Sequence, residues 1–380
     1  MSKDYYVTLT GGKNNAGDFL IKHCAGELFR TFRSDRQVID FDGWKPFTAK
    51  ELDIVNLSKG LILLGGPALQ RNMCPGVYAL TSDLRDITVP IITMGIGWYS
   101  QAGRWIDTHS YRLNKKSEAL LERIAVDGYL SSVRDYHTLN VLGSRGYENY
   151  LMTGCPALYS IEHIGSQHIN KGYDRIGFSL GVSLKTSRKM EFQMKDAILK
   201  TIEVFKDSRV EVVFHHGVGD NYLASDGVAM NLARVQASFL DWLEENSIPY
   251  VDISGSAEKL INYYETCDLH VGYRVHAHIF CNSISKASIL LNEDGRGVAL
   301  RDVIGGATLD ACQSGRRNML KIAASKLNLR VDSVLPADCM IDDFDRLMRY
   351  EKNHGIKLRQ PRKNIDLHFS QMKEFLRQLP

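Results

Sequence analysis

Short apolar runs alternate with longer amphipathic segments along most of the chain. In the first part of the sequence, runs of strand length predict strands at residues 5–10, 37–42, 60–66, 89–97 and 128–135. Helical patterns lie between some of these runs, at residues 17–32 and 117–125. Strands that alternate with helices are typical of a parallel sheet with crossover helices. We therefore predict a Rossmann-like α/β domain for this part of the chain.

A polar stretch, GSQHINKGYDR at residues 165–175, interrupts the alternation, and a second series follows. Its strand-like and helical segments alternate at residues 175–184, 190–205, 209–217, 229–246, 249–254, 256–267 and 268–272. A last helical pattern at residues 365–379 follows a basic run, KLRQPRK, which predicts a linker.

The length of 380 residues is enough for two hydrophobic cores. The predicted fold class is α/β, with two Rossmann-like doubly wound domains and a central cleft. We expect an N-terminal domain at residues 1–168 and a C-terminal domain at residues 169–350. A linker and a final helix are expected at residues 351–380.

The composition excludes some classes of protein. Forty-seven Lys and Arg residues against 44 Asp and Glu give a net charge of +3, whereas a dedicated nucleic-acid binder carries a clustered basic excess. The seven scattered cysteines show no C-x-x-C spacing, so they predict neither a zinc ribbon nor a redox motif. No uncharged apolar run approaches the roughly 20 residues of a membrane span, and no apolar signal region opens the chain. We expect a cytoplasmic protein with reduced cysteines.

Glycine-rich loops follow several predicted strands, where a doubly wound domain binds its ligands. The first, GGKNNAGDFLI at residues 11–21, opens a helix whose free N–H groups could hold an anion or orient a sugar hydroxyl. The alternative is a tight turn capped by Asp18. The loop is neither a Walker loop nor the dinucleotide fingerprint. GGP at residues 65–67 and MGIG at residues 94–97 are weaker signals of the same kind.

Charged and imidazole side chains follow two further strands. Arg134 and Asp135 end the strand at residues 128–135, and they form either a surface ion pair or a guanidinium fork aimed at a carboxylate or phosphate. His215 and His216 follow another strand, and adjacent strand residues face opposite ways, so they cannot both bind one metal ion without distortion. One of them could reach a binding site, and packing is the alternative.

The segment CDLHVGYRVHAHIFCNS, residues 267–283, has the densest candidate chemistry. An extended chain would place His270, Arg274, His276 and His278 on one face, as in an H-x-H metal site, but Arg274 would repel a cation. If a helix begins after Gly272, Arg274 and His276 lie in its first turn, where an anion relieves their conflict with the helix dipole. We favour the anion site, with the metal site and ordinary packing as alternatives.

Four of these segments, in this order, resemble the polysaccharide pyruvyl transferase family. They are GGKNNAGDFLI, SSVRDYHTLNVLGSRG, TGCPAL and VGYRVHAHIFCNSISKASILL. The resemblance implies a fold similar to that of GT-B glycosyltransferases, with a final helix that crosses back to the N-terminal domain. Two departures stand out: Cys155 replaces a usual Asp, and Pro67 replaces a third glycine.

The resemblance also implies an activity: transfer of a pyruvyl group from phosphoenolpyruvate to two hydroxyls of a saccharide, giving a cyclic ketal of a surface glycan. By this resemblance Arg274 and His276 bind the donor and Arg134 completes the clamp. Asn15, Asp18 and Asp135 are the acceptor-side residues. His276 is the candidate acid–base group, because an imidazole titrates near neutral pH, and Asp18 or Asp135 could instead accept the hydroxyl proton.

The implied partners are phosphoenolpyruvate as donor substrate and a saccharide acceptor, with no cofactor and no metal. Peripheral contact with a lipid-linked glycan and the oligomeric state stay open. One rival is a GT-B nucleotide-sugar glycosyltransferase, in which Glu293 or Asp294 would hold a ribose or sugar. A second rival is a non-catalytic sugar- or anion-binding relative. A nicotinamide dehydrogenase is disfavoured because the dinucleotide fingerprint is missing.

Overall fold

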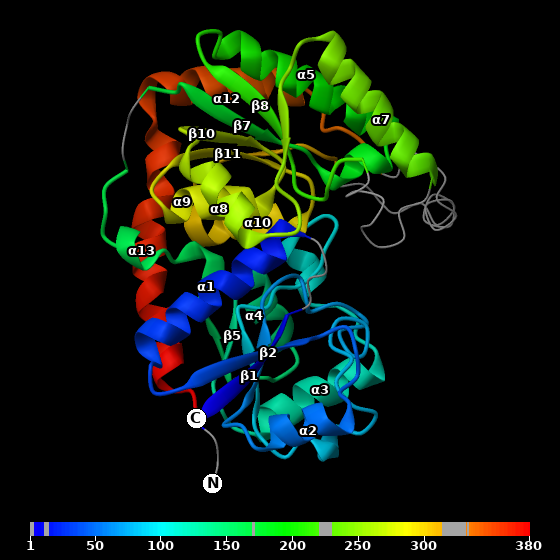
Figure 1. The fold of residues 1–380 in the computed structure, drawn as a ribbon, viewed down its shortest axis with the longest axis vertical. Coiled ribbons are helices and arrows are strands. Elements are labelled where there is room, and N and C mark those ends of the chain that lie inside the picture. The colour runs from blue at the N-terminus through cyan, green and yellow to red at the C-terminus, as the bar shows by residue number, and fades with distance from the viewer. Residues whose placement is uncertain (1–3, 11–14, 169–171, 220–229, 314–331, 333) are drawn as a thin grey trace. The chain divides into compact units, whose positions relative to one another are not determined.

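A computed structural model of the chain describes residues 4–10, 15–168, 172–219, 230–313, 332 and 334–380, and of residues 230–232 the backbone alone. Contacts within the chain divide it into two compact units (Figure 1). Unit 1 comprises residues 1–12, 21–164 and 364–380, and unit 2 comprises residues 13–20 and 165–363. Two helices, α1 (Ala16–Phe32) and α13 (Ile356–Arg377), contribute residues to both units.

Unit 1 contains a parallel sheet in the order β2–β1–β3–β4. These strands are β1 (Tyr5–Thr10), β2 (Gln37–Asp42), β3 (Leu61–Leu64) and β4 (Ile91–Met94). A parallel pair, β5 (Ser131–Val133) and β6 (Tyr150–Met152), follows β4, because the Gly95 N–H donates to the Ser132 carbonyl at 3.1 Å. The connecting helices are α2 (Ala49–Asn56), α3 (Lys115–Val126) and α4 (Tyr136–Gly143). Strands β1, β3 and β4 are buried along their whole length and therefore lie in the core.

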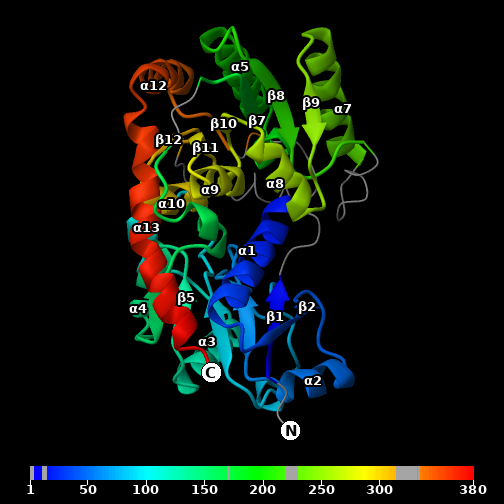
Figure 2. The same cartoon turned by 60° about the vertical axis from the view of Figure 1, so that its left-hand side comes forward.

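Unit 2 contains a parallel sheet in the order β12–β11–β10–β7–β8–β9. These strands are β7 (Arg175–Ser179), β8 (Arg209–Phe214), β9 (Tyr250–Asp252), β10 (Leu269–Gly272), β11 (Ala287–Asn292) and β12 (Ala307–Asp310). One face packs against α5 (Arg188–Val204), α7 (Met230–Glu245) and α12 (Met340–His354), which share one hydrophobic core with the strands. Helices α8 (Ala257–Glu265), α9 (Val275–Ser283) and α10 (Gly295–Ile304) lie on the opposite side of the sheet from α5 and α12 (Figure 2).

The strand orders identify the fold class. Counted from β7, the sheet of unit 2 has the Rossmann order 3-2-1-4-5-6, and β2–β1–β3–β4 in unit 1 follows the flavodoxin-like order. In such sheets a ligand binds outside the carboxyl ends of the strands where the order reverses, which in unit 2 lies between β7 and β10. The predicted α/β class with two Rossmann-like domains is confirmed.

The basic run at residues 357–363 is not a linker, as the sequence analysis predicts, but the beginning of α13. Helix α12 ends at Gly355, whose φ of 59° suits glycine. The buried carboxylate of Glu351 then accepts the backbone N–H groups of Lys357 and Leu358, at 2.9 and 3.1 Å. These bonds satisfy donors that a helix start leaves free, so a new helix follows directly. None of the helices in the described part of the chain has a segment long and apolar enough to span a bilayer.

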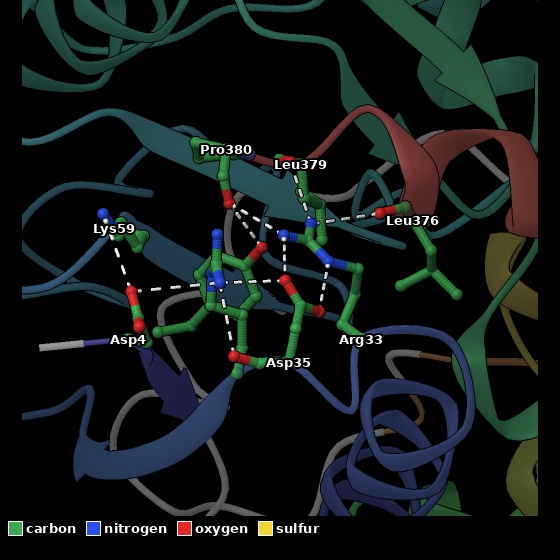
Figure 3. A network of polar contacts seen from close by, with 9 residues as sticks. Asp4, Arg33, Asp35, Lys59, Leu376, Leu379 and Pro380 are labelled. Atoms are coloured by element: carbon green, nitrogen blue, oxygen red, sulfur yellow. Dashed lines mark hydrogen bonds and ion pairs between the residues drawn. The ribbon is translucent and has the colours of Figure 1, made fainter.

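In unit 1, a buried arginine holds the carbonyls at the end of α13 (Figure 3). Nη1 of Arg33 donates to the carbonyls of Leu376 and Leu379 at 3.3 and 2.8 Å, and Nη2 donates to Pro380 O at 3.1 Å. The Tyr6 hydroxyl donates to the same Pro380 oxygen at 2.6 Å. These bonds supply donors to carbonyls that a helix end leaves unpaired. They connect the last helix to α1 and β1.

We expect Arg33→Met to lower the free energy of unfolding by about 2 kcal/mol, because it leaves buried carbonyls without donors. Chemical denaturation measures the change. Arg30→Met is the matched control, since Arg30 lies on the same helix with a side chain that is 65% exposed. Equal stabilities of the two variants would contradict the anchoring role.

Candidate functional site

The turn after β10 is fixed to the end of β7, at the point where the strand order of unit 2 reverses. Gly272 has a φ of 132°, and a Cβ at this position would lie 2.2 Å from the Ser179 carbonyl oxygen. No other residue fits here without moving backbone. The next two N–H groups bond to the same serine: Tyr273 N donates to Ser179 O, and Arg274 N donates to Ser179 Oγ, both at 3.0 Å. Position and conformation of Arg274 therefore follow from Ser179.

Arg274 is the N-cap of α9, and His276 lies in the first helical turn. The helical alternative of the sequence analysis is confirmed, and the extended H-x-H arrangement is wrong. Within the described ranges, no group of three or more His, Cys, Asp or Glu side chains is placed to hold a metal ion. His270 and His278, which an extended chain would present beside Arg274, are instead fully buried.

The Arg274 guanidinium has an imidazole, not a carboxylate, as its hydrogen-bond partner. Its Nη1 lies 2.9 Å from Nε2 of His216, and its Nε is buried without a hydrogen-bond partner in the described structure. Burial lowers the pKa of Arg274 to about 10, so the group stays charged at neutral pH. The charge of Arg274, together with burial and the nearby Lys185 and Arg296, lowers the pKa of His216 to about 2. His216 is therefore a neutral acceptor for Arg274.

His276 lies against the first turn of α1, which belongs to the same unit. A Cβ on Gly17 would lie 2.0 Å from Nδ1 of His276, so the glycine makes room for the ring. Asn15 opens this turn: its Oδ1 accepts from Gly17 N at 3.3 Å, and its Nδ2 donates to Asp18 at 3.2 Å. Asn15 thus receives the N–H bond that the sequence analysis assigned to a cap at Asp18. Residues 11–14 of the predicted loop lie outside the described residues.

A buried chain of hydroxyl and imidazole groups supports the turn from below. Ser179 Oγ lies 2.8 Å from Nε2 of His270, whose Nδ1 lies 2.8 Å from Ser288 Oγ. The same Ser288 oxygen lies 2.7 Å from Nδ1 of His278. Burial lowers the pKa of His270 well below its usual value and that of His278 to about 3, so both rings are neutral. These histidines position the backbone of Arg274 through Ser179.

Arg134 and Asp135 lie in unit 1, directly after β5. They are not a surface pair: Arg134 is 7% exposed and Asp135 1%. Asp135 is the N-cap of α4, and its Oδ1 accepts both the N–H and the hydroxyl of Thr138 at 2.7 Å. The Arg134 side chain lies against Gly97, where a Cβ would be 2.0 Å from Nε, and its Nη2 has no partner among the described residues. The MGIG loop therefore makes room for Arg134.

Two functional candidates were not identified from the sequence. His216 was one of two equivalent histidines, and the structure separates them: His216 contacts Arg274, whereas His215 bonds to the Tyr264 hydroxyl at 2.8 Å. Lys185 lies beside Arg274 at the end of the short 3-10 turn Val182–Lys185. Its only signal in the sequence is a lysine shortly after the glycine that follows the first strand of the second domain.

The comparisons with known proteins agree with this architecture. The sequence model of the family "Polysaccharide pyruvyl transferase" matches residues 15–295. The structure of S. aureus MnaA with UDP has a TM-score of 0.51 at 13% identity, covering 99% of this chain and 97% of that chain. The UDP-GlcNAc 2-epimerase from Neisseria meningitidis, bound to UDP-GlcNAc, has a TM-score of 0.48 at 10% identity, covering 98% and 99%. No curated protein sequence matches the chain.

The likeness to MnaA places the chain in the GT-B-like class of α/β folds. Within that class, the match over residues 15–295 decides the family. The chain belongs to the polysaccharide pyruvyl transferase family.

We expect Gly17→Ala to displace the His276 ring, because the new methyl group would overlap Nδ1. Gly26→Ala on the same helix is the control, since its Cβ would meet nothing closer than 3.7 Å. Alanine favours a helix interior by about 0.5–1 kcal/mol over glycine, so Gly26→Ala should raise the midpoint of thermal unfolding. Gly17→Ala should not raise it and should shift the His276 imidazole NMR signals. An unchanged His276 spectrum would contradict the contact.

We expect Ser179→Ala to lower the free energy of unfolding by about 2–3 kcal/mol, because it removes the partner of Arg274 N–H and of His270. Ser183→Ala is the control: Ser183 is also buried, but its hydroxyl has no hydrogen-bond partner in the described structure. Denaturant titration of both variants measures the difference. A loss no larger in Ser179→Ala than in Ser183→Ala would rule out the supporting role.

Proposed function

We propose that this protein transfers a pyruvyl group from phosphoenolpyruvate to two hydroxyls of a saccharide during synthesis of a surface glycan. Membership of the family supports transferase chemistry. The observation that carries the proposal is Arg274 at the N-terminus of α9, charged, largely desolvated and hydrogen-bonded to a neutral imidazole. A buried guanidinium without a carboxylate partner is costly, and a small anionic substrate removes the cost.

The reaction requires one proton to be added at carbon and two to be removed from oxygen. Protonation of the methylene carbon of the donor gives a methyl group, and the first saccharide hydroxyl forms a C–O bond at the adjacent carbon as it loses its proton. The second hydroxyl forms the other C–O bond, loses its proton and displaces phosphate by cleavage of the C–O(phosphate) bond. One hydroxyl proton balances the new methyl hydrogen, and the other leaves as hydrogen phosphate.

The proposed roles follow from where the side chains lie. Arg274 and His276 bind the donor, and Arg134 is the third predicted donor ligand. His276 is the candidate acid–base group, since it lies beside a helix start that leaves N–H groups free. Asp18 is a better candidate base than Asp135, because it follows Gly17, which contacts the His276 ring. Asp135 is already occupied by Thr138 and, at 3.4 Å, by Nε of Arg134.

The nucleotide-sugar alternative lacks support at the carboxylates it would need. Glu293 accepts the backbone N–H groups of Val182, at 2.8 Å, and Ser183. Asp294 caps α10 and pairs with the Arg296 guanidinium, at 2.7 Å for the shortest contact. Both side chains are therefore engaged within the protein. They do not offer free oxygens to a ribose.

We expect Arg274→Ala to reduce kcat/KM for phosphoenolpyruvate by at least about 10²–10³-fold, since it removes a charged donor aimed at the reacting anion. Phosphate release from phosphoenolpyruvate with an oligosaccharide extract measures turnover, and circular dichroism tests whether the fold is kept. Arg301→Ala is the control, an arginine of the same unit that pairs with Asp310 at the surface.

Three outcomes would contradict the proposal. They are turnover that survives in Arg274→Ala, binding of phosphoenolpyruvate without any phosphate release by the unmodified protein, and thermal stabilisation by a nucleotide sugar alone.

A further inference from the structure

A small cavity lies on the β7–β8 side of Arg274. Its volume is about 30 Å³, on a measure by which one water needs about 10–15 Å³. It has room for the few oxygens of one small anion and not for a sugar ring. The lining side chains relevant to binding are Lys185, His216, Gln236 and Arg274.

The cavity combines positive charge with a lack of described carboxylates. Arg274 and Lys185 are its cationic groups, and neither Asp nor Glu occurs among the residues that line it. The nearest carboxylate that acts on Arg274, that of Glu293, is bound to the backbone of the 3-10 turn. Two cations in a desolvated pocket repel one another. An anion between them would reverse the sign of that interaction.

Hydrogen-bond capacity also points to an anion. Nε of Arg274 is buried without a partner, and His216 offers no competing charge because its pKa is about 2. Gln236 uses its Nε2 to donate to Gly217 O at 2.8 Å, which closes the wall of the cavity. The groups left to hold a ligand are the guanidinium and the ammonium. Both suit phosphate oxygens.

We propose that this cavity is a phosphate subsite, in which Lys185 and Arg274 bind the phosphoryl group of the donor and retain inorganic phosphate after transfer. The identity of the donor rests on the proposed function, whereas the binding of phosphate does not. Two cations match the double negative charge of a phosphomonoester better than the single charge of a carboxylate. The subsite also explains why Arg274 faces His216: this bond directs the guanidinium to the cavity.

The subsite has a consequence for the reaction. The C–O(phosphate) bond breaks as negative charge accumulates on the leaving phosphate, so Lys185 and Arg274 would stabilise the group most strongly when it departs. Phosphate that remains in the cavity blocks the next donor. Inorganic phosphate is then a competitive inhibitor with respect to phosphoenolpyruvate.

The pH dependence of binding follows from the charged groups around Lys185. Burial, and then the charge of Arg274, lowers the pKa of Lys185 to about 8, while His216 stays neutral and Arg296 adds positive charge nearby. Lys185 is therefore charged below pH 8 and loses its proton as the pH rises through that value. A phosphate ester gains its second charge near pH 6. Affinity for phosphate should rise up to neutral pH and fall above pH 8.

Titration calorimetry of the full-length protein with inorganic phosphate tests the subsite. We expect Lys185→Met to weaken binding at least tenfold and to abolish the decrease above pH 8. Lys185→Arg should keep most of the affinity and not the decrease. Lys206→Met is the control, because Lys206 is exposed, and it should bind like the unmodified protein. Circular dichroism confirms that the variants are folded.

The outcomes separate this inference from the proposed function. Equal phosphate affinity in Lys185→Met and the unmodified protein would overturn the subsite, even if phosphoenolpyruvate is turned over. Lys185-dependent phosphate binding without turnover would support the subsite and count against pyruvyl transfer. Inhibition by phosphate that is not competitive with phosphoenolpyruvate would overturn the assignment of the cavity to the donor.

Discussion

The contact between Gly272 and Ser179 is the constraint on which the candidate site depends. Two parallel strands meet where the strand order reverses, and the backbone of one turn lies directly against the other strand. A side chain at residue 272 would separate them. Because Ser179 receives the N–H groups of both Tyr273 and Arg274, the start of α9 has one position and one direction. Arg274 then has to place its charge at the carboxyl edge of the sheet.

A charge in that position shapes its surroundings. It lowers the pKa values of His216 and Lys185, and its nearest carboxylates are engaged by backbone amides or by Arg296. The protein therefore maintains a local excess of positive charge without compensating it internally. Such an arrangement decreases stability. It is expected at a site where a substrate supplies the missing anion.

The sequence predicted the parts of the structure that local patterns determine. The apolar runs located most strands of both sheets, and the conflict between Arg274, His276 and a helix dipole correctly favoured an anion-type helix start over an extended chain. It did not predict α12, although Met340, Phe344 and Met348 form an apolar stripe at helical spacing. The basic residues after α12 suggested a linker because the capping carboxylate, Glu351, precedes them by several residues.

The rest of the candidate site depends on contacts between distant segments. Lys185 becomes a candidate because Glu293, more than a hundred residues later, holds the turn that presents it. Gly17 gains its meaning from the His276 ring. A single sequence contains no local pattern for either pairing. Arg134 and Asp135 were identified correctly as a buried polar feature, but the division between cap and free guanidinium required the bonds to Thr138.

The buried chain from Ser179 to His278 has a consequence for acid conditions. Neither of its imidazoles takes up a proton until the pH is far below neutrality, since both are enclosed. The scaffold under Arg274 therefore keeps one protonation state over the range in which enzymes are assayed. A change in catalysis between pH 5 and 7 would then report on the substrate or on groups at the surface of the pocket, and not on a rearrangement of their support.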